Sequence, residues 1–316
     1  MYKVAVVGAG QLGSRYIQGL KKVQSPLSIN VVDPSSNSLK KSRELWNTSE
    51  KDTLFHEINW GTNLGMLPAE IDLVIVSTTA DHRPGIVKDI ASKHQVKYWV
   101  LEKVLAQSVQ QLEKMSECLK FAQGSWVNTP RRMMGWHQSL KTEISSSPMH
   151  VSLLGADWGM ACNSIHFIDL VAWWTGETLK TINISGLEKK WHPSKRAGFF
   201  EIFGRLAAEF SSGSTLLLNS SNDDIEVRID VLSNQTNWSI NEAKGHAISS
   251  AGDTIFGRLE LQSEMTESLV TKILSTGTCE LPTYEESMPM HIVLVEQLLT
   301  NWNLANNCSR STLPIT

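Results

Sequence analysis

The chain has 316 residues, of which 41% are hydrophobic and 19% charged, and its formal net charge is -3. This length accommodates two ordinary domains, and the composition is typical of a globular protein. The small negative net charge excludes a general electrostatic attraction to nucleic acid or to anionic membranes, so we expect neither as a partner.

The first residues and the cysteines indicate a cellular setting. The chain opens directly into the strand-like segment 2–7, without the charged and apolar regions of a secretory signal. No apolar run has the length needed to span a bilayer. The cysteines lie far apart and form no metal-binding or disulfide framework; they are Cys118, Cys162, Cys279 and Cys308. We therefore expect a cytoplasmic protein without a metal site.

Strands and helices are predicted to alternate through the first part of the chain. We expect strands at 3–7, 28–32, 71–77, 98–101 and 126–128. Helices are expected at 11–23 and 36–46, from Pro84, and from the capping residue Ser108 to Gly124. This alternation predicts a parallel, doubly wound sheet, which is an α/β Rossmann domain over residues 1–128.

After Pro130 the predicted strands follow one another as a block. They cover 150–154, 181–186, 205–210, 214–219 and 225–232, with a hairpin turn at 211–213. One helix, 164–175, precedes most of them, and helices 264–275 and 285–303 follow. This order predicts an α+β domain, residues 129–316, with a large, open and mostly antiparallel sheet for substrate binding and oligomerisation.

A glycine-rich turn follows the first strand and opens the first helix. Its sequence, Gly8-Ala9-Gly10-Gln11-Leu12-Gly13, fits GxGxxG in the context that dinucleotide-binding proteins require. Gly8 permits the tight turn, Gly10 lets the backbone approach a pyrophosphate, and Gly13 lets the helix pack close to the strand. The helix N-terminus offers free amides to the phosphates. An ordinary glycine turn is the alternative.

Asp33 ends the second strand, 25 residues after Gly8. A carboxylate there accepts hydrogen bonds from both ribose hydroxyls and repels a 2′-phosphate. Ser35 and Ser36 follow, with no arginine beside them. The sequence therefore favours NAD over NADP, although an Asp-Pro turn would also place an aspartate here.

The pair Glu102-Lys103 ends a later strand, at the edge of a parallel sheet where ligands bind. A lysine in this place can hydrogen-bond a substrate hydroxyl and tune its proton transfer. A solvated surface lysine is the alternative.

Several motifs together resemble the Gfo/Idh/MocA family of glucose-fructose oxidoreductase and inositol dehydrogenase relatives. The order is GxGxxG, Asp33, the segment 76–82, then Glu102-Lys103-Val104. His166-Phe167-Ile168-Asp169-Leu170, followed by 173–176, is similar to the family's His-x-x-Asp-Leu helix, and 281–284 is similar to its ending. The likeness covers nearly the whole chain.

The resemblance implies reversible hydride transfer on a sugar, polyol or related hydroxy compound. Lys103 matches the family lysine that contacts the reacting oxygen, and His166 matches the histidine that acts as acid or base. Asp169 is expected to orient or support rather than to react. Further cofactor-binding residues are expected on the nicotinamide side of the cleft and beside Lys103, namely Thr78, Thr79, His82 and Glu102.

The sequence departs from the family pattern at two positions. Cys162 stands where many relatives carry an aspartate, and Val104 stands where they carry a proline. Neighbouring Asn163 can hydrogen-bond a substrate hydroxyl but cannot act as a carboxylate base. Arg131 is a further substrate-binding candidate, with a surface ion pair as the alternative. The basic loop 189–196 either receives an acidic or nucleotide-linked sugar or is a solvated loop.

These observations predict an NAD-dependent oxidoreductase of a sugar-like alcohol or its ketone, assembled as a homodimer or homotetramer. The substrate could be a nucleotide sugar or an acidic sugar of polysaccharide synthesis. One rival is a non-catalytic NAD-binding regulator on the same fold, because Cys162 replaces a carboxylate. Another is a non-redox enzyme that uses tightly held NAD transiently.

Overall fold

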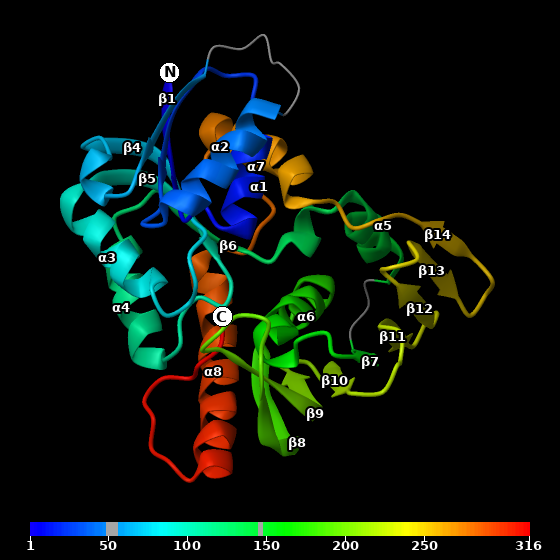
Figure 1. The fold of residues 1–316 in the computed structure, drawn as a ribbon. Coiled ribbons are helices and arrows are strands. Elements are labelled where there is room, and N and C mark those ends of the chain that lie inside the picture. Colours follow the sequence, from blue (N-terminus) through cyan, green and yellow to red (C-terminus); the bar gives the residue numbers. More distant parts are fainter. Residues whose placement is uncertain (49–55, 145–147) are drawn as a thin grey trace. The chain divides into compact units, whose positions relative to one another are not determined.

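The structure, a computed structural model, describes residues 1–48, 56–144 and 148–316. These residues form two compact units (Figure 1). The first comprises Met1–Leu105, Gln111–Asn128 and Glu260–Tyr284, and the second comprises Ala106–Gln110, Thr129–Leu259 and Glu285–Thr316. The predicted second domain included Glu260–Tyr284, whereas this segment packs with the first unit.

The first unit contains a parallel sheet in the order β3-β2-β1-β4-β5-β6. Strand β1 lies at its centre, where Val6 pairs with Val31 of β2 and with Ile75 of β4. These strands are buried on both faces, which explains their continuous apolar runs. The strands are β1 (Tyr2–Val7), β2 (Leu27–Val32), β3 (Glu57–Gly61), β4 (Glu70–Val76), β5 (Gln95–Glu102) and β6 (Gly124–Asn128).

Helices cover both faces of this sheet (Figure 1). On one face lie α1 (Gln11–Leu20), α2 (Ser36–Thr48) and α7 (Gln262–Thr276); on the other lie α3 (Arg83–Lys93) and α4 (Val109–Leu119). Helix α1 packs against both α2 and α7. The returning chain also extends the sheet edge, because the Val127 amide of β6 donates to the Pro282 carbonyl at 3.0 Å.

The second unit contains a sheet in the order β14-β13-β12-β11-β7-β10-β9-β8. All its pairs are antiparallel except β7 with β10. The predicted, mostly antiparallel sheet is thus confirmed. Its strands are β7 (Met149–Ala156), β8 (Leu179–Pro193), β9 (Phe200–Phe210), β10 (Thr215–Ser221), β11 (Arg228–Ser233), β12 (Trp238–Asn241), β13 (His246–Ser249) and β14 (Thr254–Phe256).

Three α-helices complete the described part of this unit: α5 (Gly135–Ile144), α6 (Met160–Thr175) and α8 (Tyr284–Asn306). A 3-10 turn, η2 (Pro130–Met133), precedes α5. Helix α6 packs on β9 and β10. It buries Ile165, Ile168 and Val171, which form its apolar side against the sheet.

Some predicted boundaries were wrong. Helix α6 begins at Met160 rather than near Ser164, so His166 lies in its second turn and not at its start. Gly124 begins β6 instead of closing α4. The hairpin turn between β9 and β10 is confirmed, because the Phe210 amide donates to the Ser214 carbonyl at 2.9 Å. Strands β3 and β12–β14 and helix α5 were not anticipated.

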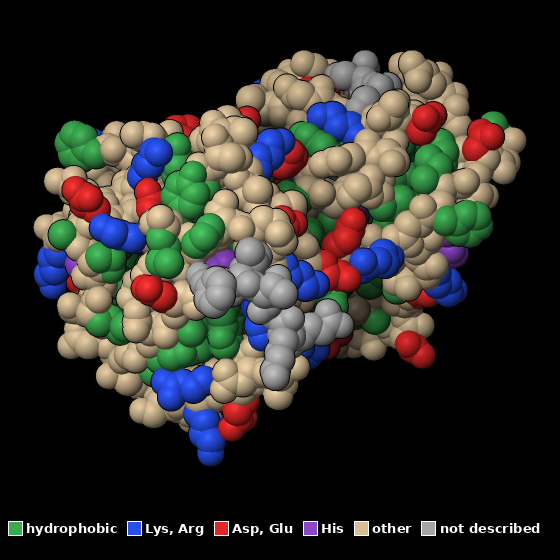
Figure 2. Space-filling model, turned by 90° about the horizontal axis from the view of Figure 1, so that it is seen from above, with side chains coloured by type: hydrophobic (Ala, Val, Ile, Leu, Met, Phe, Trp, Pro, Cys, Tyr) green, Lys and Arg blue, Asp and Glu red, His purple; other side chains and the backbone are tan. Residues whose placement is uncertain are grey.

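The surface in Figure 2 carries acidic and basic side chains interspersed among polar and apolar ones. Among the described residues, this face therefore has no large area of a single charge sign. Among the helices of the described residues, we find none that is long and apolar enough to cross a membrane.

Candidate functional site

The glycine turn has the backbone shape that its sequence predicts. Gly8 adopts a φ of +99°, in the left-handed region that favours glycine. A Cβ on Gly13 would lie 1.8 Å from the Gly8 carbonyl oxygen, so a side chain is sterically excluded there. In contrast, a Cβ on Gly10 would meet nothing within 4 Å among the described residues. No described side chain caps the first turn of α1, so its first amides have no side-chain acceptor among the described residues.

Asp33 follows β2 and is held against this turn. Its Oδ2 accepts a hydrogen bond from the Ala9 amide at 2.7 Å, and its Oδ1 accepts one from the Ser35 amide at 2.8 Å. Asp33 is 9% exposed. The carboxylate is therefore fixed beside the turn, with its charge available to a neighbouring ribose.

The loop after β4 touches the same turn from the other side. Ser77 Oγ donates to the Gly8 carbonyl at 2.6 Å, and the Thr78 methyl would lie 3.0 Å from a Cβ on Gly8. Thr78 Oγ1 is buried without a hydrogen-bond partner among the described residues. Thr79 is half-buried, whereas the His82 side chain is 75% exposed and lies 3.5 Å from the Asp81 carboxylate.

Lys103 directly follows β5 and is half-buried, and its peptide bond to Val104 is cis. Glu102, 4% exposed, accepts hydrogen bonds from the Tyr16 hydroxyl and from Asn128 Nδ2, both at 2.7 Å. Burial raises the pKa of Glu102 above its usual value, although these two hydrogen bonds oppose the rise. Glu102 therefore supports the sheet edge below Lys103; its predicted contact with the cofactor remains a prediction.

Arg83, which is not among the predicted site residues, is buried at the start of α3. Its guanidinium donates hydrogen bonds to the carbonyl oxygens of Thr78, Val104 and Leu105. One signal pointed to it: a cation in the first turn of a helix opposes the helix dipole, so it needs compensation from elsewhere.

In the second unit, the first turns of α6 carry Cys162, Asn163 and His166. Each is half-buried. Cys162 and His166 are four residues apart on one helix face. Glu201 of β9 lies at this end of the helix, where its Oε2 accepts from the Ala161 amide at 2.7 Å and from the Cys162 amide at 3.4 Å.

The side chain of Asn163 is directed to the backbone, since its Nδ2 donates to the Trp158 carbonyl at 2.8 Å. No sequence motif predicts that Glu201 lies at the start of α6. A carboxylate thus lies beside Cys162, although it comes from a strand rather than from α6 itself.

Arg131 makes a bidentate ion pair with Glu242. Its Nε and Nη2 donate to the two oxygens of Glu242 at 2.7 and 2.6 Å, and His137 Nε2 lies 2.8 Å from the same carboxylate. Burial raises the pKa of Glu242, but the guanidinium of Arg131 and the hydrogen bonds outweigh it and hold this pKa well below its usual range. The predicted contact of Arg131 with substrate therefore remains a prediction.

Asp169 is buried and paired within the second unit. Arg132 Nε and Nη2 donate to its two oxygens at 3.0 and 2.7 Å, and Thr129 Oγ1 donates at 2.8 Å. Burial raises the pKa of Asp169, and the charge of Arg132 opposes the rise. These contacts join the start of the unit to α6, in keeping with a supporting role for Asp169.

The aromatic residue of the basic loop belongs to the core. Trp191 is buried, packs edge-on against Trp302 at 5.1 Å between ring centroids, and donates from Nε1 to Asn301 at 2.9 Å. Lys189, Lys190, Lys195 and Arg196 are exposed. The indole is therefore engaged away from solvent. The predicted loop is wrong over 189–193, because these residues belong to strand β8.

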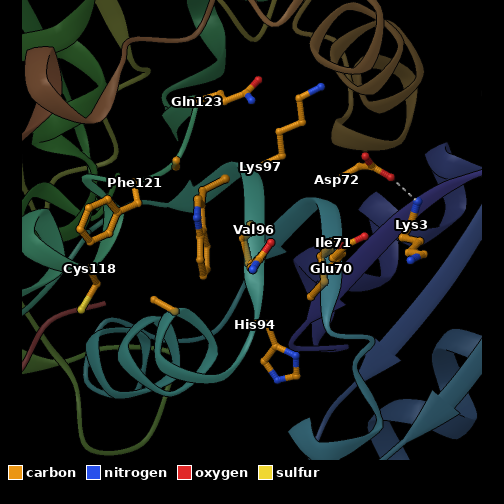
Figure 3. A pocket seen from close by; sticks show the side chains of 14 residues that line it. Lys3, Glu70, Ile71, Asp72, His94, Val96, Lys97, Cys118, Phe121 and Gln123 are labelled. Carbon is orange, nitrogen blue, oxygen red and sulfur yellow. Dashed lines mark hydrogen bonds between the residues drawn. The ribbon is translucent and has the colours of Figure 1, made fainter.

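A hollow of about 590 Å³ opens at the other edge of the first sheet, where the strands begin (Figure 3). It lies between the starts of β4 and β5 and the ends of α3 and α4, and none of the predicted site residues lines it. The Lys3 amide donates to Asp72 at its rim. Among the described residues, no group of three or more His, Cys, Asp or Glu side chains could hold a metal ion.

Comparisons with solved structures show the same fold over nearly the entire chain. An oxidoreductase from Agrobacterium radiobacter, in complex with NAD+, L-tartaric acid and magnesium, matches with a TM-score of 0.72 at 15% identity, covering 95% of this chain and 96% of that one. Myo-inositol 2-dehydrogenase from Lactobacillus plantarum matches with a TM-score of 0.68 at 16% identity, over 96% and 97% of the two chains.

A putative NADPH-dependent oxidoreductase from Desulfitobacterium hafniense matches with a TM-score of 0.68 at 13% identity, over 94% and 95% of the two chains. No curated protein matches the sequence. Residues 2–127 match the model of the Gfo/Idh/MocA oxidoreductase family, described as an NAD-binding Rossmann fold. Over this N-terminal part, the chain is similar to the NAD-binding domain of Gfo/Idh/MocA oxidoreductases.

Proposed function

We propose that this protein is an NAD-dependent oxidoreductase that transfers hydride between nicotinamide and a sugar-like alcohol or its ketone. The observation that carries the proposal is the open space at Gly10, together with the start of α1, which no described side chain caps, and the Asp33 carboxylate held on the Ala9 amide. Backbone amides at a helix N-terminus suit a pyrophosphate, and the carboxylate suits the adenine ribose. Thr78, whose hydroxyl has no hydrogen-bond partner among the described residues, adds a polar group next to this turn for a bound dinucleotide.

We infer NAD rather than NADP as the cofactor from the charge at Asp33. A carboxylate held at this position repels a 2′-phosphate. In isothermal titration calorimetry we expect NAD to bind more tightly than NADP, and Asp33→Ala to remove this preference. Asp89→Ala, on the exposed side of α3, is the matched control and should leave both affinities unchanged. Tighter binding of NADP to the native protein would overturn the inference.

In the proposed reaction, two side chains have separate roles. The hydride chemistry would come from NAD when it is bound. Lys103 would hydrogen-bond the carbinol oxygen and stabilise charge on it, and His166 would take up or return the hydroxyl proton. Thr78, Thr79, His82 and Glu102 are proposed neighbours of the nicotinamide, and Asn163, Cys162 and Arg131 proposed contacts of the substrate hydroxyls.

The substrate class is proposed from the fold relatives and tested by a screen. One relative is an inositol dehydrogenase and another was solved with a hydroxy acid, so polyhydroxylated compounds are the first candidates. NADH absorbance would be followed with inositols, sugars, hydroxy acids, acidic sugars and nucleotide sugars. We expect Lys103→Ala and His166→Ala to lower turnover at least about 100-fold. The control Lys97→Ala, at the other end of β5, should retain it.

A protein that binds NAD but turns over nothing in the screen would instead be the non-catalytic regulator. NAD retained through purification, without net NADH release, would indicate a non-redox reaction. We further propose a cytoplasmic homodimer or homotetramer, which light scattering after size-exclusion chromatography would test.

A further inference from the structure

Arg83 is an unusual residue for its place in the fold. It is the first residue of α3 and only 1% exposed. Burying a guanidinium is costly unless hydrogen bonds or charges compensate it, and the positive end of a helix dipole disfavours it further. The neighbouring structure must therefore supply specific partners for this side chain.

The partners are carbonyl oxygens from two loops at the carboxyl edge of the first sheet. The Thr78 carbonyl belongs to the loop after β4. The Val104 and Leu105 carbonyls belong to the segment that directly follows Lys103, with Leu105 at 3.1 Å. A planar guanidinium with five donors can serve several acceptors at fixed angles, which an ammonium group cannot do.

These contacts continue to the glycine turn. Ser77, next to Thr78, donates from Oγ to the Gly8 carbonyl at 2.6 Å. The turn, the loop after β4 and the segment after Lys103 are thus connected in series, with Arg83 between the last two. Burial raises the pKa of Glu102, and the charge of Arg83 is among the causes that oppose this rise.

We propose that Arg83 is a positioning residue: it holds the backbone beside Lys103 in a fixed relation to the cofactor turn, so that the Lys103 amine stays directed toward the reacting oxygen. This inference rests on the proposed function for the role of Lys103 in turnover. Its structural part, the placement of the Lys103 amine, can be tested in the cofactor-free protein.

The experiment compares Arg83→Lys, which keeps the positive charge but loses the planar guanidinium, with Arg83→Gln, which loses both. Leu73→Ala, in the core of β4 away from these loops, serves as a control for lost stability. Trace acetylation with acetic anhydride and peptide mass spectrometry measures the reactivity of Lys103, with exposed Lys97 and Lys120 as internal references. NAD affinity and steady-state kinetics on the best substrate of the screen complete the set.

We expect Lys103 reactivity to change severalfold in both Arg83 variants and to stay constant in Leu73→Ala. Turnover should fall about 10- to 100-fold in Arg83→Lys while NAD affinity stays within about threefold, because small misplacement of a reacting group has effects of this size. Unchanged Lys103 reactivity in both variants, or an equal change in Leu73→Ala, would overturn the proposal. Absence of NAD binding in the native protein would refute the proposed function but leave the acetylation result valid.

Discussion

The glycine turn of the first unit and helix α6 of the second hold their predicted functional residues in different ways. The turn is defined by its own backbone, since Gly8 needs a positive φ and Gly13 cannot carry a side chain. The start of α6 is instead held by Glu201, 40 residues away from Ala161, and its middle by Arg132 through Asp169. A backbone conformation that requires glycine can be recognised as a sequence motif, whereas side-chain contacts between residues distant in the sequence cannot.

The largest expected effect tests the long-range contacts of α6. Arg132→Met would leave the Asp169 carboxylate buried without its cation, so we expect a loss of about 3–5 kcal/mol in the free energy of unfolding, measured in urea. The double variant Arg132→Met/Asp169→Leu should recover most of it, because no unpaired charge remains. A loss below about 1 kcal/mol for the single variant, as for an exposed pair, would show that α6 does not depend on this contact.

The turn is tested by adding one methyl group. In Gly13→Ala the new Cβ would overlap the Gly8 carbonyl oxygen, so we expect NAD affinity in calorimetry to fall about 100-fold and stability by about 1–3 kcal/mol. Gly85→Ala, on exposed α3 with open space around it, is the matched control and should instead gain about 0.5 kcal/mol. Equal behaviour of the two variants would contradict a sterically defined turn.

The Arg131–Glu242 pair makes the second unit sensitive to acid. Because the pKa of Glu242 is lowered in the folded protein, its stabilising contribution is fully present above the unfolded value of about 4.3. It declines below that pH and is lost as the pH falls through the folded pKa. We expect Glu242→Gln to cost about 2 kcal/mol near pH 7 and clearly less toward pH 3, in urea unfolding at both pH values. Glu113→Gln, exposed on α4, should show no such dependence. A pH-independent cost for Glu242→Gln would contradict the depressed pKa.

The smallest effect concerns the support below Lys103. Tyr16→Phe removes the hydrogen bond from the Tyr16 hydroxyl to the buried Glu102, and we expect a loss of about 1 kcal/mol in thermal or chemical unfolding. Tyr2→Phe, at the exposed start of β1, should be neutral. A neutral Tyr16→Phe would mean that Asn128 alone suffices to hold the carboxylate.

Much of the first unit could be predicted because its strands are long apolar runs and its turn has a glycine pattern. The segment Ile71–Val76 and the turn Gly8–Gly13 are examples in which local physics decides the structure. Strand β3 was missed because it is short and only half-buried, and β12–β14 because they have three or four residues each. Such strands depend on their neighbours in the sheet more than on their own sequence.

Among the site residues, the positions of Asp33 and Lys103 at strand ends could be predicted from strand boundaries. The partners Arg83, Glu201 and Glu242 could not, because each acts through residues distant in the sequence. Arg131 illustrates the limit: the sequence allowed a substrate contact or an ion pair, and only the position of Glu242 decides what the guanidinium touches.

The return of Glu260–Tyr284 to the first unit has a consequence for biosynthesis. Helix α7 packs so tightly on α1 that a Cβ on Gly19 would lie 2.5 Å from the Thr266 Cβ. The Pro282 carbonyl also accepts a hydrogen bond from Val127 of the edge strand β6. A ribosome that has made only residues 1–128 has produced all six parallel strands but not the helix that covers α1. The first unit is therefore complete only after translation has passed residue 284, and a fragment of residues 1–128 would expose the side of α1 that α7 covers.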